Sequence, residues 1–150
     1  MAVDVLTETV IDRPCSEVAA FAGDPRNAPR WYVNIEAVEL KTPPPLAVGS
    51  RMEFTARFLG RRLVYTYEVI DHVAGERLAM RTAEGPFPME TTYTWAKVDD
   101  GHTRMTLRNR GEPSGFGKLA APLMAGAMRR ANQNDLARLK ALLERATTSE

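Results

Sequence analysis

Residues 113–145 of this 150-residue chain read PSGFGKLAAPLMAGAMRRANQNDLARLKALLER, and the predicted sheet is organised around them. It predicts one long C-terminal helix from Pro113 to Arg145. The part up to Met128 is apolar and rich in methionine and small residues, whereas the part after Asn134 has the pattern of an amphipathic helix. Pro122 has no backbone N–H and crowds the preceding turn, which predicts a kink or a late helix start there.

The two parts of this helix are predicted to have different roles. In the first part, one side of the helix would carry Phe116, Leu119, Ala120, Leu123 and Ala127, which we expect to cover a cavity as a lid. The polar run 132–134 separates this side from the leucines at 136, 139 and 143, which we expect to anchor the helix to a sheet.

The chain before this helix alternates between apolar and polar residues, as antiparallel strands do. Strands are predicted over residues 3–12, 35–41, 49–59, 61–71, 77–83, 89–98 and 103–110, with two short helical segments between the first two strands. Gly60 and the run Asp99-Asp100-Gly101 suit tight hairpin turns. Because the long helix is the only large element left, it is predicted to cover the apolar face of the sheet.

Composition limits the class of protein. The length fits a single domain over residues 1–146 with a loose tail at 147–150. A formal net charge of +1 argues against a nucleic-acid partner, and the single Cys15 excludes an internal disulfide. The longest apolar run, residues 119–128, is far below the roughly 20 residues that cross a membrane. We therefore expect a cytoplasmic monomer or homodimer without stable membrane insertion.

Several stretches resemble the SRPBCC superfamily, also called START-like or Bet v 1-like, and within it the small bacterial polyketide cyclase/dehydrase proteins. They are residues 11–18, Asp24-Pro25 with Trp31, residues 95–107 and residues 135–144. The resemblance implies an α+β helix-grip fold, in which a curved seven-stranded antiparallel sheet wraps around the long C-terminal helix, with two short helices after the first strand. It also implies a deep cavity that binds a lipid-, sterol- or polyketide-like molecule.

The candidate ligand-binding residues are side chains with inward parity on the strands, together with Trp31 and apolar side chains of the long helix. Methionine is common among them, and its flexible side chain adapts to ligands of varied shape. For any single residue the alternative is a place in a solid core. The candidates are Trp31, Phe54, Phe58, Tyr65, Tyr67, Met80, Met89, Thr91, Tyr93, Trp95, Met105, Leu107, Asn109, Phe116, Leu119, Leu123, Met124, Ala127 and Met128.

Tyr65, Tyr67 and Tyr93 are the sharpest polar features, because a buried hydroxyl group needs a hydrogen-bond partner. They are candidates for binding a ligand carbonyl or phenol, or for weak general-acid catalysis, with Asn109 helping to position an enolate. The alternative is that each hydroxyl reaches a backbone carbonyl or water. The first functional hypothesis is a protein that binds a small hydrophobic or aromatic molecule. The alternatives are a cyclase or dehydratase enzyme and a protein-interaction module of the same fold.

The sequence points to no metal and no cofactor. His72 and His102 lie near turns, and neither has a second metal-binding residue at ligand spacing. The serine-hydrolase, phosphate-loop and dinucleotide-binding motifs do not occur. Cys15 is predicted to open the first short helix.

Charged residues on the strands are predicted to face solvent. Glu53, Glu68 and Glu90 fall on the polar parity of their strands. The arginines at 104, 108 and 110 form a basic stripe on the last strand, which is typical of a solvated face paired with neighbouring acids such as Glu90.

Overall fold

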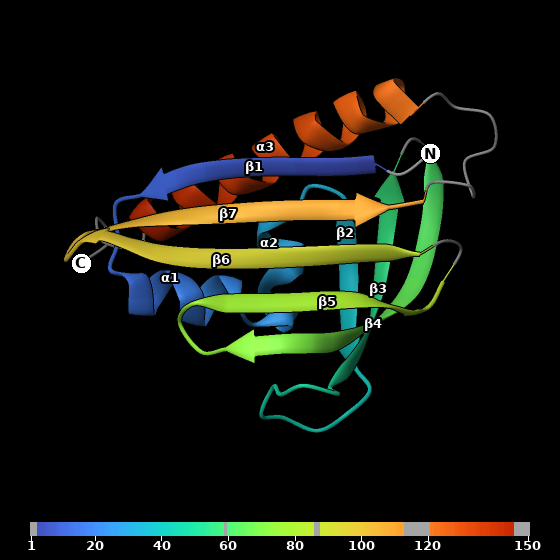
Figure 1. Ribbon diagram of the computed structural model, residues 1–150, viewed down its shortest axis with the longest axis horizontal. Coiled ribbons are helices and arrows are strands. Elements are labelled where there is room, and N and C mark those ends of the chain that lie inside the picture. Colours follow the sequence, from blue (N-terminus) through green and yellow to red (C-terminus); the bar gives the residue numbers. More distant parts are fainter. Residues whose placement is uncertain (1–2, 59, 86–87, 113–120, 146–150) are drawn as a thin grey trace.

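A curled antiparallel sheet of seven strands holds one long helix against its inner side (Figure 1). The computed structural model describes residues 3–58, 60–85, 88–112 and 121–145. The strands are β1 (Val3–Ile11), β2 (Ile35–Leu40), β3 (Arg51–Phe58), β4 (Arg61–Val73), β5 (Arg77–Glu84), β6 (Met89–Asp99) and β7 (His102–Gly111). They lie in the order β1-β7-β6-β5-β4-β3-β2, so β1 pairs with the last strand. The predicted helix-grip architecture is confirmed.

The helices lie behind the strands in the view of Figure 1. The short ones, α1 (Cys15–Ala22), η1 (Pro25–Asn27) and α2 (Ala28–Trp31), follow β1 as predicted. Asp24 starts η1 by accepting a hydrogen bond from the Arg26 backbone N–H at 3.0 Å, which satisfies a donor that the short helix leaves free. Helices this short gain their stability from packing, and α1 and α2 lie against β6 and β2.

The long helix α3 spans Ala121–Arg145. Pro122 is the second described residue of this helix, so the predicted kink or late start at Pro122 depends on residues outside the described part. The predicted helical residues 113–120 and the predicted tail at 147–150 lie outside the described part of the chain. Leu136 and Leu139 are almost completely buried in the main core, in agreement with an anchoring role for the second part of the helix.

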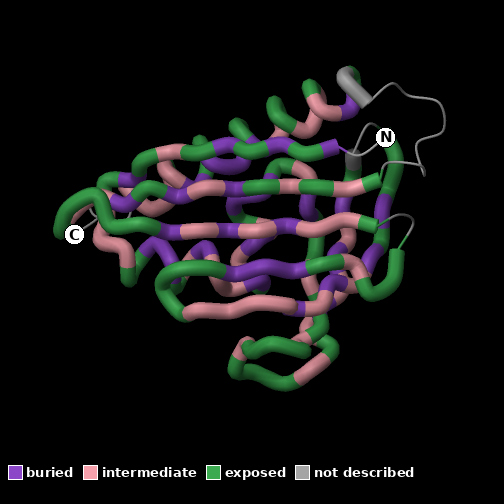
Figure 2. Tube along the Cα trace, in the orientation of Figure 1, coloured by how far each residue is buried: buried purple, intermediate pink, exposed green. Residues whose placement is uncertain are grey.

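Buried and more exposed residues alternate along the strands (Figure 2), and the buried ones are mostly the apolar residues that the alternation predicted. On β4, for example, Leu63, Tyr65, Tyr67 and Val69 are buried, whereas the residues between them are more exposed. A smaller apolar cluster joins β1 to the first turns of α3 through Val3, Val5 and Met124. Among the described residues, the first part of the helix is thus attached by a separate and smaller apolar cluster than the second part.

The basic stripe on the outer face of β7 is paired, as expected for a solvated surface. Arg108 contacts Asp4 at 2.6 Å, and Arg110 contacts Glu90 at 2.8 Å. Exposed pairs of this kind contribute little stability, about 0–1 kcal/mol each.

Candidate functional site

A cavity of about 110 Å³ lies between the inner face of the sheet and α3. Strands β3 to β7 contribute alternate side chains to its walls, because every second residue of a strand faces the same side. Ten of the predicted ligand-binding residues line this cavity: Phe54, Tyr65, Tyr67, Met80, Met89, Thr91, Tyr93, Asn109, Met124 and Met128.

Other predicted residues lie elsewhere. Trp31, Met105 and Leu107 are completely buried in the core and do not line the cavity. Trp95 lies beside a different hollow, near α1. Ala127 is half-buried outside the cavity lining. The side chains of three further candidates, Phe58, Phe116 and Leu119, lie outside the described residues.

The prediction that Leu123 faces the cavity is wrong, because its side chain is 66% exposed whereas Met124 is 1% exposed. Consecutive residues of an α-helix are about 100° apart, so both cannot face the same side. The inward stripe therefore runs through Met124 and Met128 rather than through Leu123 and Ala127.

A line of hydrogen bonds crosses the cavity from the sheet to the helix. The Thr91 hydroxyl donates to Asn109 Oδ1 at 2.5 Å, so Tyr67 is left to donate to Thr91 Oγ1 at 2.7 Å. Asn109 Nδ2 in turn donates to Asn132 Oδ1 at 3.1 Å. The line ends at Asn132 Nδ2, a buried donor with no partner among the described residues. Leaving such a donor unsatisfied costs free energy, so a hydrogen bond from this amide to an acceptor on a ligand would favour binding.

Three further tyrosines, Tyr32, Tyr65 and Tyr93, also line the cavity. The hydroxyl oxygens of Tyr32 and Tyr93 are 2.5 Å apart, so each tyrosine has the other as its partner. The Tyr65 ring stacks on Phe54 with centroids 5.5 Å apart, and its hydroxyl makes no hydrogen bond to a described residue. Burial raises the pKa of all these phenols above the usual value, and that of Tyr67 reaches about 12. They are therefore neutral hydrogen-bonding groups near pH 7.

Asp135 is the only carboxyl group in the described lining of the cavity. Its side chain is 4% exposed, and Oδ1 accepts a hydrogen bond from the Val33 backbone N–H at 2.8 Å. Burial raises the pKa of Asp135 to about 7, although this hydrogen bond and the charge of Arg138 act in the opposite direction. A titratable group with a strongly shifted pKa inside a cavity is a common property of functional sites.

Asn132 and Asp135 were not predicted as site residues, because the polar run 132–134 was interpreted as a break between two helix faces. The helical spacing of these residues could have identified them as cavity residues. Counting from Met124, positions 128, 131, 132 and 135 follow at intervals of four, seven, eight and eleven residues, which keeps them on one face. Tyr32 and Asn34 lie in the irregular segment around the end of α2, where no periodicity identifies an inward side chain.

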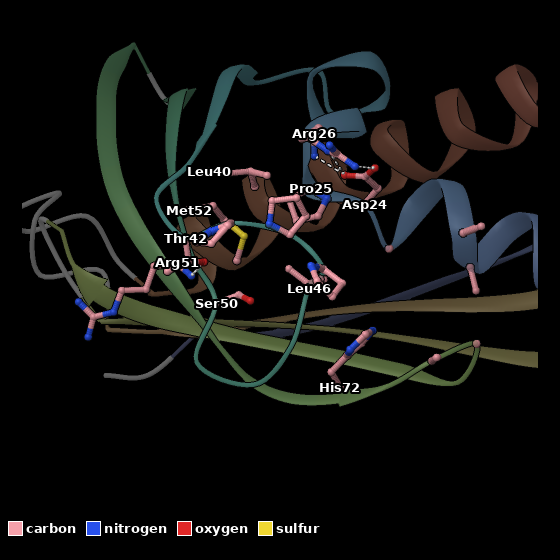
Figure 3. A pocket seen from close by; sticks show the side chains of 18 of the residues that line it. Asp24, Pro25, Arg26, Leu40, Thr42, Leu46, Ser50, Arg51, Met52 and His72 are labelled. Atoms are coloured by element: carbon pink, nitrogen blue, oxygen red, sulfur yellow. Dashed lines mark hydrogen bonds and ion pairs between the residues drawn. The ribbon is translucent and has the colours of Figure 1, made fainter.

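A larger hollow, of about 690 Å³, lies between α1, η1 and the segment that joins β2 to β3. Figure 3 shows Pro25, Leu46 and His72 around it. The arginines among its lining residues are already paired, Arg26 with Asp24 at 2.9 Å and Arg51 with Glu68 at 2.9 Å. The smaller cavity is the better candidate site, because it combines apolar walls with buried polar groups that have unused bonding capacity.

The roles of the tyrosine hydroxyls can be separated by mutation. Tyr67→Phe removes the donor to Thr91 and is expected to lower the free energy of unfolding by about 1 kcal/mol. Tyr65→Phe removes no hydrogen bond to a described residue and keeps the ring stacked on Phe54, so a change below about 0.5 kcal/mol is expected. Urea denaturation of the two variants measures both values, and an equal loss in both would contradict this assignment.

Comparisons with known proteins agree with this architecture. A comparison with curated proteins gave no match. Among solved structures, an aromatase/cyclase from a Streptomyces species has a TM-score of 0.80 at 17% identity, covering 98% of this chain and 96% of that one. A START superfamily protein from Mycobacterium smegmatis has a TM-score of 0.82 at 12% identity, covering 95% and 98%. A protein from Thermus thermophilus has a TM-score of 0.80 at 22% identity, also covering 95% and 98%.

These identities establish a shared fold and no shared substrate. Within the described ranges, no helix is long and apolar enough to span a membrane. The sequence profile of one family, described as polyketide cyclase / dehydrase and lipid transport, matches residues 2–144. Since that match covers nearly the whole chain and the fold agrees with it, the protein belongs to the polyketide cyclase / dehydrase and lipid transport family.

Proposed function

We propose that the protein binds a small, largely apolar molecule that contains a ring and one or two polar groups, in the cavity between the sheet and α3. The observation that carries this proposal is the combination of aromatic and methionine walls with three polar groups that have free bonding capacity. These are the Tyr65 hydroxyl, Asn132 Nδ2 and the Asp135 carboxyl group. Small-molecule sites typically consist of an apolar pocket with a few such groups.

The size of the cavity limits the ligand. A volume of about 110 Å³ is below the roughly 300–1,000 Å³ of most ligand pockets, but well above the space that one water molecule needs. A single ring with a short substituent fits without rearrangement. A ligand with several rings would require the first turns of α3 to move, and these turns are attached to β1 through the small cluster around Met124.

An enzyme of the cyclase or dehydratase type is the second candidate, as the name of the Streptomyces aromatase/cyclase suggests. The observation that favours it is Asp135, because a general acid or base works best with a pKa near the working pH, and the pKa here is about 7. If the protein is an enzyme, Asp135→Asn should abolish turnover while leaving the binding of a neutral product analogue within a few-fold.

Filling the cavity provides the test of the proposed function. Ala131 lines the cavity from α3, so Ala131→Trp places a large side chain in the space that the ligand would occupy. We expect this variant to bind benzyl alcohol at least about tenfold more weakly than the wild type, measured by titration calorimetry.

The matched control is Ala137→Trp, which adds the same side chain on the exposed face of the same helix. It should bind benzyl alcohol with the wild-type affinity. Equal affinity in all three proteins, with α3 still folded by circular dichroism, would show that the probe binds elsewhere and would count against this cavity as the site.

A further inference from the structure

We propose that the preferred ligand of this cavity is a basic amine, with its ammonium group bound between the Asp135 carboxylate and the surrounding tyrosine rings. This inference rests on the proposed function, because it assigns a ligand class to the same site. It begins with the fact that Asp135 Oδ1 is held by the Val33 N–H, whereas Oδ2 has no hydrogen-bond partner among the described residues.

The carboxylate has no cation of its own within the cavity. Arg110 is the one basic side chain in the described lining, and it is bound to Glu90 at 2.8 Å. Arg138 lies one turn further along α3, is exposed, and donates to the Arg30 backbone carbonyl at 3.2 Å. Burying a carboxylate without a paired cation costs free energy. A ligand that supplies a positive charge offsets this cost and is therefore bound more tightly.

Three tyrosines, Tyr32, Tyr65 and Tyr93, line the same cavity as Asp135. The charge of Asp135 raises the pKa of the Tyr32, Tyr65 and Tyr93 hydroxyls, in addition to the larger effect of burial. A cation bound to Asp135 would therefore lie among electron-rich ring faces and neutral phenol oxygens, which attract ammonium groups. Asp135 and these rings together form a negatively polarised end of the cavity.

Asn132 defines the other requirement of the ligand. It precedes Asp135 by three residues on α3, so the two side chains are neighbours on one helix face, about 5–6 Å apart at their Cβ atoms. Its free Nδ2 is a donor and requires an acceptor oxygen or ring face on the ligand. The cavity thus fits a compact arylalkylamine with a hydrogen-bond acceptor close to the amine or on the ring.

The test compares benzylamine with benzyl alcohol, which differ in charge but hardly in size. Titration calorimetry at pH 8 is expected to show that the wild type binds benzylamine at least about tenfold more tightly. In Asp135→Asn this preference for the amine should disappear. Asp100→Asn, at an exposed hairpin position, is the control for general electrostatic attraction and should keep the preference for the amine.

The wild type also provides a test that needs no variant. Since the amine binds the ionised carboxylate, its affinity should rise about tenfold per pH unit below the Asp135 pKa of about 7 and level off above it. The hydroxyls of Tyr32, Tyr65 and Tyr93, which line the same cavity, have pKa values raised above their usual value, so they stay neutral in this range.

The failure of this inference can be distinguished from the failure of the proposed function. Binding of benzyl alcohol as tight as that of benzylamine in the wild type, or an amine preference that persists in Asp135→Asn, would overturn the amine proposal alone. Binding of neither probe by the wild type would overturn both proposals.

Discussion

Replacing Asp135 with asparagine is expected to stabilise the protein at pH 8 by up to about 4 kcal/mol and to have little effect at pH 4. In the folded state burial raises the pKa of Asp135 from 3.8 to about 7, so the folded protein holds this proton more tightly than the unfolded chain. The free energy of unfolding contributed by Asp135 therefore falls as the pH rises from about 4 to about 7. At 1.36 kcal/mol per pKa unit, the shift of about three units sets the upper limit.

Asparagine cannot ionise, and its side-chain oxygen can still accept the hydrogen bond from the Val33 N–H. Urea denaturation of both proteins at several pH values measures the difference. Subtracting the two curves removes the contributions of exposed acids such as Asp4 and Asp99, whose pKa values are lowered by their partners and which act alike in both proteins. A difference that is constant between pH 4 and pH 8 would contradict a buried, titrating Asp135.

Trp31→Ala is expected to lower the free energy of unfolding by about 3–5 kcal/mol. Trp31 is completely buried at the end of α2, and its ring lies edge-on to Tyr32 at 4.3 Å and tilted against Tyr93 at 5.7 Å. Removing it would leave a cavity behind the Tyr32–Tyr93 pair. The same variant is therefore expected to weaken the binding of ring probes, since two walls of the site lose their support.

Trp31→Phe serves as the matched control. The buried indole N–H has no hydrogen-bond partner in the described part of the molecule, so its removal relieves an unsatisfied donor and offsets part of the lost packing. We expect a loss of less than about 2 kcal/mol by thermal or urea denaturation. Equal losses for alanine and phenylalanine would show that the donor, and not the volume of the ring, determines the effect.

The sheet was predictable from the sequence because each strand buries one face. Alternation identified Phe54, Tyr65, Tyr67 and Tyr93 as inward residues, and the period of two leaves no intermediate orientation. The curved seven-stranded sheet followed from the resemblance, and the single helix that covers it followed from the lack of any other large element. The pairing of β1 with β7 was not predicted, because strand alternation carries no information on which strands are neighbours.

The helix was less predictable because its amphipathic pattern is weak in the first part. Leu123 and Met124 are both apolar neighbours, and only the position of the helix over the sheet decides which of them is buried. Small residues around them dilute the periodicity on which such a choice depends.

The polar half of the site was missed for a physical reason. Sequence patterns assume that polar helix residues face water, whereas Asn132 and Asp135 are buried against Asn109 and the Val33 N–H. Their partners come from segments far away in the sequence, so local spacing alone does not reveal the hydrogen bonds. Sequence patterns fail to predict buried polar residues on an otherwise apolar face. Such failures are expected at functional sites.

A crystal structure of the protein soaked with 4-bromobenzyl alcohol will show where a bound ring lies. The anomalous signal of bromine marks the position of the ring without ambiguity. We predict one strong peak between the sheet and α3, within contact distance of Phe54, Tyr65 or Met80, which line the cavity. A peak in the hollow beside Trp95, or no peak at a concentration that saturates binding in solution, would contradict a binding site between the sheet and α3.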